Sequence, residues 1–244
     1  MQKLTRPRIL FVLPHPDDES FVTGGTIARY AHSGDAEVML YTLTRGEASR
    51  NAAFQGITGE EIAAMRVQEV KDAAALLGVS CQLQGRYPDG GLRDLDPRVL
   101  EQDLTRVISE LMPHVLVTFD VQGWSVHPDH ISVHHAVKRV FVEMRELPGG
   151  PKRLCFIGPP AARVAHWPRR VYGIPPHRID AIIDVSKWRT IEEAAIRRHH
   201  SVRRDVEEHN YDEWMFWPED SYTFFQESFD PPVHDLLHGL LNLH

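Results

Sequence analysis

Two short clusters of histidine and aspartate contain the residue types that bind transition metals and catalyse hydrolysis. The first, residues 14–19, reads PHPDDE and follows the apolar run 8–13; the second, residues 127–130, reads HPDH and follows the apolar run 115–119. Catalytic zinc is usually held by three side chains drawn from histidine, aspartate and glutamate, which leaves a fourth position for water. Together the clusters supply such a set: His15, Asp18 and His130.

The residues beside this set indicate how a reaction would run. Zinc lowers the pKa of a bound water to about 7, but a base must still take a proton as the water attacks a carbonyl. Asp17 is adjacent to a predicted ligand and free of the metal, so we expect it to be that base. We expect His127 to donate a hydrogen bond or a proton to the charge that develops on the tetrahedral intermediate. Asp129 is a candidate for orienting a metal-bound histidine.

Each cluster taken singly has a simpler interpretation. A lone His-Pro-Asp after a strand is usually a turn, in which the aspartate bonds its own backbone. Taken together the clusters are harder to explain in this way, because so many carboxylates and imidazoles crowded at one place would repel and desolvate one another without a cation. The sequence therefore favours a metal site, provided that the two segments converge.

The elements that must bring these segments together alternate between strands and helices. Strands are predicted over residues 8–13, 38–43, 79–83, 115–119, 154–157 and 181–185. Helices are predicted over residues 21–32, 58–77, 96–111 and 128–144, and after Ser186. Residues 159–176 are too long for a routine connection, so they form a functional loop or contain a further element. The aromatic tail after Asp205 is expected to pack against the domain.

This alternation predicts an α/β fold: three layers, Rossmann-like, with a mostly parallel sheet covered by helices on both faces. Both clusters then follow the carboxyl ends of strands. In open α/β sheets that edge forms the ligand crevice, so segments far apart in the sequence can converge there. A length of 244 residues suits one domain, which we expect to extend over residues 1–244.

Composition is typical of an ordinary soluble globular protein. The net charge of −7 argues against a nucleic-acid partner, because such proteins usually present a basic surface. Cys81 and Cys155 are the only cysteines, too few for a disulfide framework, and both are expected to be core thiols. The first apolar run is too short to span a membrane and lacks a cleavage site. We therefore expect a cytoplasmic protein without a membrane span.

Other polar or glycine positions carry weaker signals. His134 and His135 are expected to have ordinary roles on a helix surface. His199 and His200 lie among arginines, which suggests a helix with a solvated basic face. The glycine pair at residues 24–25 follows the first strand but lacks the G-x-G-x-x-G spacing, so the dinucleotide-binding fingerprint is absent from the sequence.

The motifs PHPDDES at residues 14–20 and HPDH at residues 127–130 resemble those of the metal-dependent N-acetylglucosaminyl deacetylase family, often called LmbE-like or PIG-L-like. Members of that family trim sugar conjugates in thiol, glycolipid and antibiotic biosynthesis. The similarity extends from about residue 8 to residue 230. It includes TRGE at 44–47, RVQE at 66–69, LG at 77–78, DG at 89–90, the helix from Lys187 through His199 and Ser201, and ESF at 227–229.

The resemblance implies a Rossmann-like fold and the same roles that the chemistry suggests. It implies zinc held by three residues, a general base at Asp17 and stabilisation of the intermediate by His127. The three ligands that it implies are His15, Asp18 and His130.

Two further residues receive substrate roles from the resemblance. It implies that Arg66 points into the crevice and grips the sugar hydroxyls or a phosphate of the substrate. A helix-surface ion pair with Glu69 at i+3 is the simpler alternative. By similarity Glu47 would help to shape the pocket, and a buried structural hydrogen bond is an equal alternative for it.

The chain also departs from the family pattern. Val202 stands where the family usually has glutamine, which weakens a substrate role for the helix that contains His199. Ser125 stands where some relatives that act on thiol precursors have a mobile tyrosine. Tyr87 and Tyr172 are candidates to replace that tyrosine.

The sequence therefore predicts a zinc-dependent hydrolase that removes the N-acetyl group from an N-acetylglucosaminyl conjugate, with another divalent transition metal as a possible cofactor. Two alternatives stay open: a zinc amidase that acts on a larger thiol or antibiotic conjugate, and a non-catalytic sugar- or nucleotide-binding protein with a structural metal. Relatives suggest a homo-oligomer. The substrate-selecting parts are expected in residues 47–59 and 159–176, because loops diversify freely.

Overall fold

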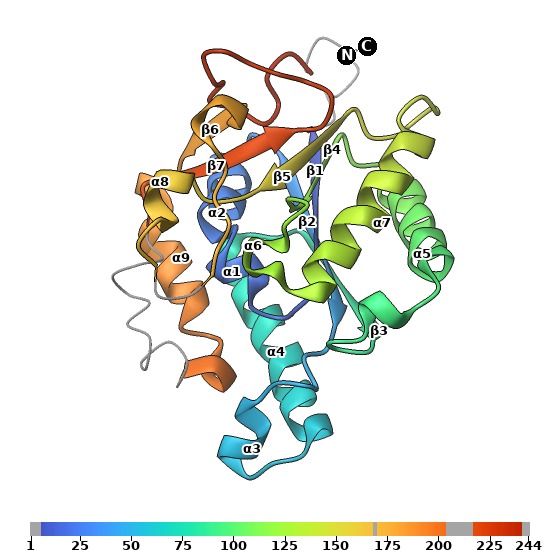
Figure 1. Cartoon of the computed structure of the whole chain (residues 1–244), viewed down its shortest axis with the longest axis vertical. Helices are drawn as coiled ribbons and strands as arrows, with labels where there is room; N and C mark the ends of the chain where they lie inside the picture. Colours follow the sequence, from blue (N-terminus) through green and yellow to red (C-terminus); the bar gives the residue numbers. More distant parts are fainter. Residues whose placement is uncertain (1–5, 168–169, 204–216, 241–244) are drawn as a thin grey trace.

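A seven-stranded sheet runs through the computed structural model, which describes residues 6–167, 170–203 and 217–240 (Figure 1). The strands are β1 Arg8–Leu13, β2 Glu37–Thr44, β3 Cys81–Tyr87, β4 Val115–Phe119, β5 Arg153–Ile157, β6 Ala181–Asp184 and β7 Glu219–Phe224. Their order across the sheet is β3-β2-β1-β4-β5-β7-β6. Neighbours from β3 to β5 pair in parallel, whereas β7 runs antiparallel to both β5 and β6.

Helices connect most of these strands. The α-helices are α1 Asp18–Phe21, α2 Gly24–Ser33, α3 Asn51–Gln55, α4 Gly59–Leu77, α5 Pro97–Leu111, α6 Gly123–Val126, α7 Pro128–Met144, α8 Ala161–Val164 and α9 Arg189–Ile196. Short 3-10 turns are η1 Leu92–Asp94, η2 Pro176–Arg178, η3 Ser186–Trp188 and η4 His200–Val202. Among the described residues, none of the helices is long and apolar enough to cross a membrane.

Two hydrophobic cores lie on opposite faces of the sheet. Successive side chains of a strand point to opposite faces, so Ile9, Phe11 and Leu13 of β1 enter one core and Leu10 and Val12 the other. Helices α2, α4 and α9 cover the first core, and α5 and α7 cover the second (Figure 1). The prediction of a three-layer α/β fold with a mostly parallel sheet is confirmed.

Helix α4 has the boundaries that its sequence signals predict. The Thr58 side chain accepts the Glu61 N–H at 3.2 Å, and the Glu61 carboxylate accepts the Thr58 N–H at 2.7 Å. At its other end Gly78 adopts φ 83°, a left-handed conformation that glycine reaches without a steric penalty. These two caps fix the length of the helix that presents Arg66 and Glu69.

Strand β7 is the main element that was not predicted from the sequence. The aromatic tail was expected to pack against the domain, and one part of it, β7, is inserted into the sheet between β5 and β6. The strand has no apolar pattern in the sequence, because its first residues, Glu219, Asp220 and Ser221, are polar. Asp220 accepts hydrogen bonds from the Thr26 N–H and hydroxyl, so its carboxylate serves as a cap for the start of α2. Residues 204–216 of this tail lie outside the described part of the chain.

Several other boundaries differ from the prediction, and the helix expected over residues 21–32 is divided into α1 and α2. Strand β3 covers 81–87 instead of 79–83. It is an edge strand that pairs only with β2 in the described chain, and its polar residues Gln82, Gln84 and Arg86 do not give the apolar pattern of a buried strand. Within residues 159–176, the further element is the short helix α8. Helix α9 ends at Ile196, so His199 and His200 lie beyond it and not on a helical basic face.

Candidate functional site

The two histidine–aspartate clusters meet where β1 and β4 end. These strands pair side by side and in parallel, so the segments that follow them leave the sheet at the same edge. His15 Nδ1 lies 3.2 Å from His130 Nε2. The carboxylate oxygens of Asp18 lie 3.5 Å from His15 Nδ1 and 3.6 Å from His130 Nε2. The structure thus brings together the three residues that the sequence predicts as metal ligands.

Local structure fixes each of the three side chains. The His15 N–H donates to Asp18 Oδ2 at 2.9 Å, which folds the segment after β1 back onto itself. The Phe119 ring, from the last residue of β4, stacks on the His130 ring with centroids 3.9 Å apart and an interplanar angle of 17°. All three predicted ligands are at least nine-tenths buried. Their positions therefore follow from the ends of two adjacent strands.

A second pair of carboxylates faces the other nitrogen of His15. Asp89 Oδ1 and Asp129 Oδ2 each lie 3.2 Å from His15 Nε2. Asp129 also accepts the N–H of Gly90 at 2.7 Å and that of Leu92 at 3.0 Å, so its orientation is fixed. From the sequence, the Asp-Gly turn at Asp89 was recognisable only as a family motif. Its position after β3, two strands from β1, gave no sign of a contact with His15.

Charges in the cluster are strongly coupled. Burial lowers the pKa of His15, but hydrogen bonds to Asp129, Asp18 and Asp89 outweigh burial and hold that pKa well above its ordinary value. Burial lowers the pKa of His130 to about 3, so its imidazole is neutral and has a lone pair to offer. Burial would raise the pKa of Asp18, but it is held at about 2 by His130, which is charged at the low pH where Asp18 titrates, and by the charge of His15 and hydrogen bonds from its ring and its backbone N–H.

This donor set fits a metal ion. In each of two groups of residues the possible ligand atoms lie within 4.8 Å of one another: His15, His127 and His130 form one group, and His15, Asp89 and Asp129 form the other. Asp18 is in neither group, but its carboxylate oxygens lie 3.5 Å from His15 Nδ1 and 3.6 Å from His130 Nε2. Two imidazole nitrogens that point at one place repel each other unless a proton or a cation lies between them. Nitrogen and carboxylate oxygen are ligands that zinc and similar metals accept. This cluster could therefore hold a metal ion.

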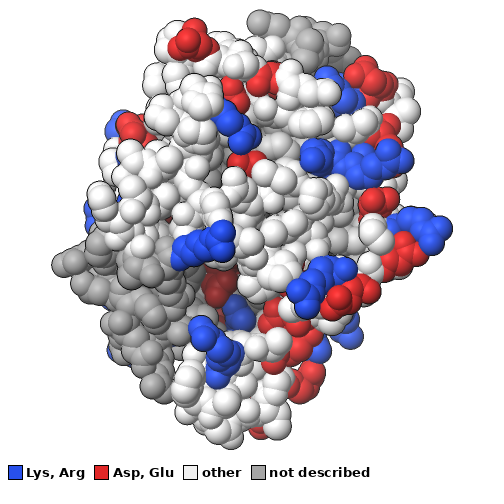
Figure 2. Space-filling model, viewed as in Figure 1, with Lys and Arg blue, Asp and Glu red and all other residues white. Residues whose placement is uncertain are grey.

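Asp17 lies beside the cluster in an unusual backbone conformation. Its φ of 117° is in the positive region that residues with a Cβ rarely adopt. Its carboxylate accepts a hydrogen bond from Arg66 Nη2 at 2.8 Å. Burial raises the pKa of Asp17 to about 6, against the opposing effect of the Arg66 guanidinium. In Figure 2, acidic and basic side chains lie next to each other in a hollow over the region of α1 and α4.

Arg66 is buried and bound to the protein itself. It is 5% exposed, and besides Asp17 it donates to the carbonyl oxygens of Pro16 and Gly46. Gly46 has φ 73°, and a Cβ at this position would lie 2.4 Å from Arg66 Nη1, so only glycine lets the guanidinium enter. The alternative of an ion pair with Glu69 is wrong, because the Glu69 carboxylate accepts the N–H and hydroxyl of Ser201.

His127 begins helix α7 and faces His15. Its Nδ1 accepts the Asp129 N–H at 3.2 Å, so in the neutral ring the hydrogen is on Nε2, where it is available for donation. The ring makes an edge contact with that of His15, with centroids 4.7 Å apart. Burial and the nearby His15 lower the pKa of His127.

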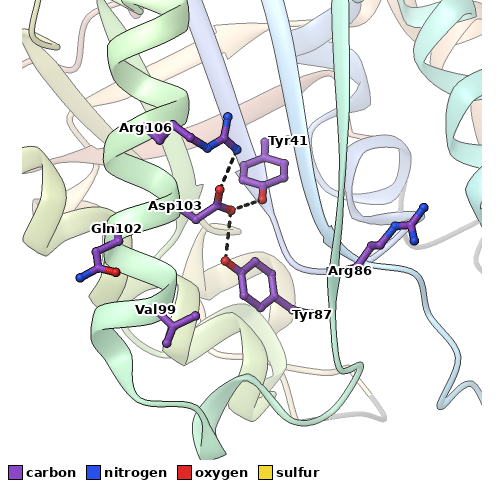
Figure 3. Close-up of a pocket in the computed structure, with 7 residues that line it drawn as sticks. All are labelled: Tyr41, Arg86, Tyr87, Val99, Gln102, Asp103 and Arg106. Atoms are coloured by element: carbon purple, nitrogen blue, oxygen red, sulfur yellow. Dashed lines mark hydrogen bonds and ion pairs between the residues drawn. The ribbon is translucent and has the colours of Figure 1, made fainter.

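The two candidate tyrosines lie on different sides of the site. The Tyr87 hydroxyl donates to Asp103, which Tyr41 and Arg106 also bind, in a surface hollow beside α5 (Figure 3). Burial, together with the Asp103 carboxylate, raises the pKa of Tyr87 to about 12. Tyr172 instead bonds through its backbone N–H to the Trp124 carbonyl oxygen, next to α6. Tyr172 is therefore the one of the two that lies near the segment containing Ser125 and His127.

Glu47, His134 and His199 have structural partners. Glu47 accepts the Asp89 N–H at 3.0 Å and so supports the turn that presents Asp89 to His15. The expectation of a helix-surface role for His134 is wrong: it is 2% exposed and its Nδ1 lies 2.9 Å from the Phe119 carbonyl oxygen. The expected solvated face is also wrong for His199, which is 2% exposed and pairs with Glu19.

Comparisons with known proteins agree with the resemblance of the motifs. The family model described as GlcNAc-PI de-N-acetylase, PIG-L, matches residues 10–141. The 1D-myo-inositol 2-acetamido-2-deoxy-alpha-D-glucopyranoside deacetylase of Mycobacteroides abscessus is 33% identical over 228 residues, which cover 80% of this chain and 81% of that protein. The deacetylase of the same name from Thermobifida fusca is 37% identical over 171 residues, 59% of this chain and 58% of that protein.

Solved structures share the fold at lower identity. The N,N'-diacetylchitobiose deacetylase of Pyrococcus horikoshii superposes with a TM-score of 0.66 at 20% identity, covering 92% of this chain and 87% of that one. The 4-carboxy-2-hydroxymuconate hydratase GalB of Pseudomonas putida gives 0.68 at 18% identity, covering 91% and 98%. Because a hydratase and a deacetylase match equally well, these structures support the fold alone. The family model and the similarity over most of both chains go further, and they show that this chain belongs to the PIG-L family of GlcNAc-PI de-N-acetylases.

Proposed function

We propose that this chain is a zinc-dependent hydrolase that removes the N-acetyl group from an N-acetylglucosaminyl conjugate. The observation that supports this most is the convergence of His15, Asp18 and His130 within 3.6 Å of one another, with Asp17 alongside. The relatives named above as deacetylases act, by their names, on an acetamido sugar joined to inositol. We propose that this chain catalyses the same reaction. We also propose that residues 1–244 form a single domain.

His15, Asp18 and His130 are the proposed zinc ligands. They offer two imidazole nitrogens and a carboxylate, the donor set of many catalytic zinc sites. Zinc bound there would lower the pKa of a water and polarise the acetamide carbonyl. Asp129 orients His15 by accepting a hydrogen bond at Nε2, which leaves Nδ1 for the metal.

Asp17 is the proposed general base. It accepts the proton of the water that attacks the acetamide carbon and returns this proton to the nitrogen as the C–N bond breaks, which gives acetate and a free amine. Arg66 keeps the Asp17 carboxylate directed by the 2.8 Å hydrogen bond at Nη2. His127 presents its Nε2–H for the oxygen that gains charge in the tetrahedral intermediate. This role agrees with the neutral ring that its lowered pKa favours.

Arg66 and Glu47 complete the proposed substrate side of the site. Each binds a residue that faces the cluster: Arg66 binds Asp17, and Glu47 binds the backbone of Asp89. Sugar hydroxyls are well suited to acidic oxygens and to N–H donors in such a crevice. We propose that these residues contact the sugar, and that residues 47–59 and 159–176 recognise the group attached to it.

Release of acetate by purified enzyme of known zinc content tests the proposal. The substrates are N-acetylglucosaminyl inositol, N,N'-diacetylchitobiose, free N-acetylglucosamine and a glucosaminyl conjugate with a larger acyl group or thiol amide. Acetate and free amine in equal amounts from an N-acetyl conjugate support the deacetylase. Cleavage of the larger amide alone would support the amidase alternative, and binding without turnover by the zinc-loaded protein would support a binding protein.

Two further expectations stay predictions. The suggested homo-oligomer is tested by light scattering on the purified full chain, where a mass equal to one chain would contradict it. A cytoplasmic location is tested by fractionation of the cells that make the protein.

A further inference from the structure

We propose that the buried His199–Glu19 pair positions Asp17, by holding the backbone of Asp17 in the conformation that presents its carboxylate to Arg66 and to the cluster. The inference rests on the proposed function, because it assigns positioning residues to the general base of that reaction. Neither His199 nor Glu19 is a proposed metal ligand or a group that touches the substrate. Both act through Asp17.

The conformation of Asp17 needs an external support. A non-glycine residue in a sparsely populated backbone region costs about 1–3 kcal/mol and persists only where the surroundings enforce it. Asp17 has φ 117° and ψ −31°. Its N–H donates to Glu19 Oε2 at 3.0 Å, across a single intervening residue. This hydrogen bond holds the N–H of the peptide group before Asp17, and Arg66 binds the carbonyl oxygen of the same peptide group at Pro16.

Glu19 is in turn held by a residue 180 positions later in the chain. His199 Nε2 lies 2.7 Å from Glu19 Oε1, and a carboxylate oxygen accepts, so His199 Nε2 carries the hydrogen. The Ser20 hydroxyl donates to the same oxygen at 2.6 Å. The side chains of Glu19 and His199 are both 0% exposed. A carboxylate this deeply buried needs such partners, because an unpaired one would be strongly destabilising.

Helix α4 closes a ring around Asp17. One turn apart on this helix, Arg66 binds the Asp17 carboxylate and Glu69 binds Ser201, two residues after His199. The N–H and hydroxyl of Ser201 lie 2.8 Å and 2.6 Å from the two oxygens of Glu69. The turn that holds His199 is thereby fixed to the helix that holds Arg66. Arg66 thus constrains the side chain of Asp17 and Glu19 constrains its backbone, and both belong to one connected ring of contacts.

Replacement of His199 tests this ring. Glutamine can place its amide N–H near the position of Nε2, whereas leucine fills the space without a donor. We expect His199→Leu to lower kcat by about 10- to 100-fold, the loss that a misplaced catalytic group causes. We expect KM to change by less than about threefold, because only the transition state uses a correctly placed base. We expect His199→Gln to retain most of kcat, because its amide N–H can replace that of Nε2. Bound zinc should stay at the wild-type ratio in both variants.

A histidine far from the site provides the matched control. His114 is part-buried at the other end of β4, where its Nδ1 accepts the Arg8 N–H at 3.1 Å. His114→Leu also removes a histidine hydrogen bond, and we expect it to leave kcat unchanged at a temperature where all variants are folded. Equal loss of kcat in His199→Leu and His199→Gln, or no loss in either, would overturn the proposal. Loss of zinc in proportion to activity would overturn it as well.

A second measurement does not depend on the reaction. Hydrogen exchange of the Asp17 N–H, followed by NMR on protein labelled with 15N-aspartate, reports the bond to Glu19 directly. We expect exchange at Asp17 to be at least about 10-fold faster in His199→Leu and unchanged in His199→Gln. If His199→Leu does not fold, Ser201→Ala replaces it and is expected to give the same pattern with a smaller change. Unchanged exchange of the Asp17 N–H in a folded His199→Leu or Ser201→Ala variant would contradict the proposal, whether or not the protein is a deacetylase.

Discussion

His15 Nδ1 and His130 Nε2 face each other at 3.2 Å across the ends of two adjacent strands. Asp18 places its carboxylate oxygens within 3.6 Å of both nitrogens. Burial keeps His130 neutral, so the arrangement provides lone pairs and negative charge around one point. A divalent cation satisfies all three groups at once, whereas a single shared proton satisfies only two of them.

Removal of one of these groups should therefore release the metal. We expect His130→Ala to weaken zinc affinity by more than about 100-fold, since loss of a mere supporting residue behind a ligand already costs about 10- to 100-fold. Competition with a chromophoric chelator measures the affinity. His134→Ala is the control, because His134 is on the same helix and equally buried but bonds a backbone oxygen. A normal affinity in His130→Ala would remove this residue from the ligand set.

Asp17→Asn should separate metal binding from turnover. Asparagine keeps the shape of the side chain but cannot take a proton, and loss of a general base typically costs about 100- to 10,000-fold in rate. We expect turnover of an N-acetyl sugar conjugate to fall by at least about 100-fold while bound zinc is retained. Steady-state kinetics and metal analysis on the same preparation provide the measurement. Near-normal turnover in the variant would exclude Asp17 as the base.

The convergence of the clusters was predictable because it follows from topology. Parallel strands deliver the segments after them to one edge, so the positions of residues 14–19 and 127–130 after buried strands were enough to place them together. The apolar runs of β1 and β4 and the caps of α4 are strong local signals. The overall layers followed from these elements, and the PIG-L resemblance was confirmed by the family match.

Contacts that depend on side-chain direction were not predictable in this way. Asp89 reaches His15 because β3, an edge strand with polar residues, extends to residue 87, farther than its apolar residues indicated. His199 looked like part of a basic helix, since the arginines around it dominate the pattern. Its burial depends on the end of α9 at Ile196, which no proline or glycine marks in the sequence. Strand β7 was not predicted because it begins with acidic residues, one of which, Asp220, binds Thr26 of α2.

The strain at Asp17 predicts that glycine is more stable than alanine at this position. Relief of about 1–3 kcal/mol of backbone strain exceeds the entropy cost of glycine, about 0.5–1 kcal/mol. Both variants remove the acceptor of the Arg66 hydrogen bond, and only alanine keeps the Cβ. We expect Asp17→Gly to melt about 2–4 °C above Asp17→Ala. Thermal unfolding in a single metal state provides the comparison. At the exposed Arg197, which has φ −66°, the order should reverse, with Gly less stable than Ala.

A lower melting temperature for Asp17→Gly than for Asp17→Ala would mean that the conformation at Asp17 is not strained. The ring of Glu19, His199 and Arg66 would then be unnecessary to maintain it. Arg197 provides the control, because its negative φ imposes no strain on a residue with a Cβ.

Glu192, which is buried, and Asp220, which is part-buried, form an acidic pair beside the start of α2. Glu192 accepts the Gly25 N–H at 3.2 Å, and Asp220 binds Thr26. Burial, together with the neighbouring Asp220 carboxylate, raises the pKa of Glu192 to about 8, and burial raises that of Asp220 to about 6. A carboxyl whose pKa is raised on folding does not destabilise the fold at low pH, where it is protonated in both states. It lowers the free energy of unfolding as the pH rises from the unfolded pKa towards the folded one.

Glu192→Gln should therefore stabilise the protein at high pH and not at low pH. Each tenfold change in proton affinity is worth about 1.4 kcal/mol, so we expect a gain on the order of 5 kcal/mol at pH 9 that disappears near pH 4.5. Melting temperatures of the wild type and the variant from pH 4.5 to pH 9 measure this difference. Glu193→Gln on the same helix is the control for charge, because Glu193 pairs with Arg189 at 2.9 Å on the outer side of α9. A gain for Glu192→Gln of the same size at every pH would show that packing, and not the buried charge, is responsible.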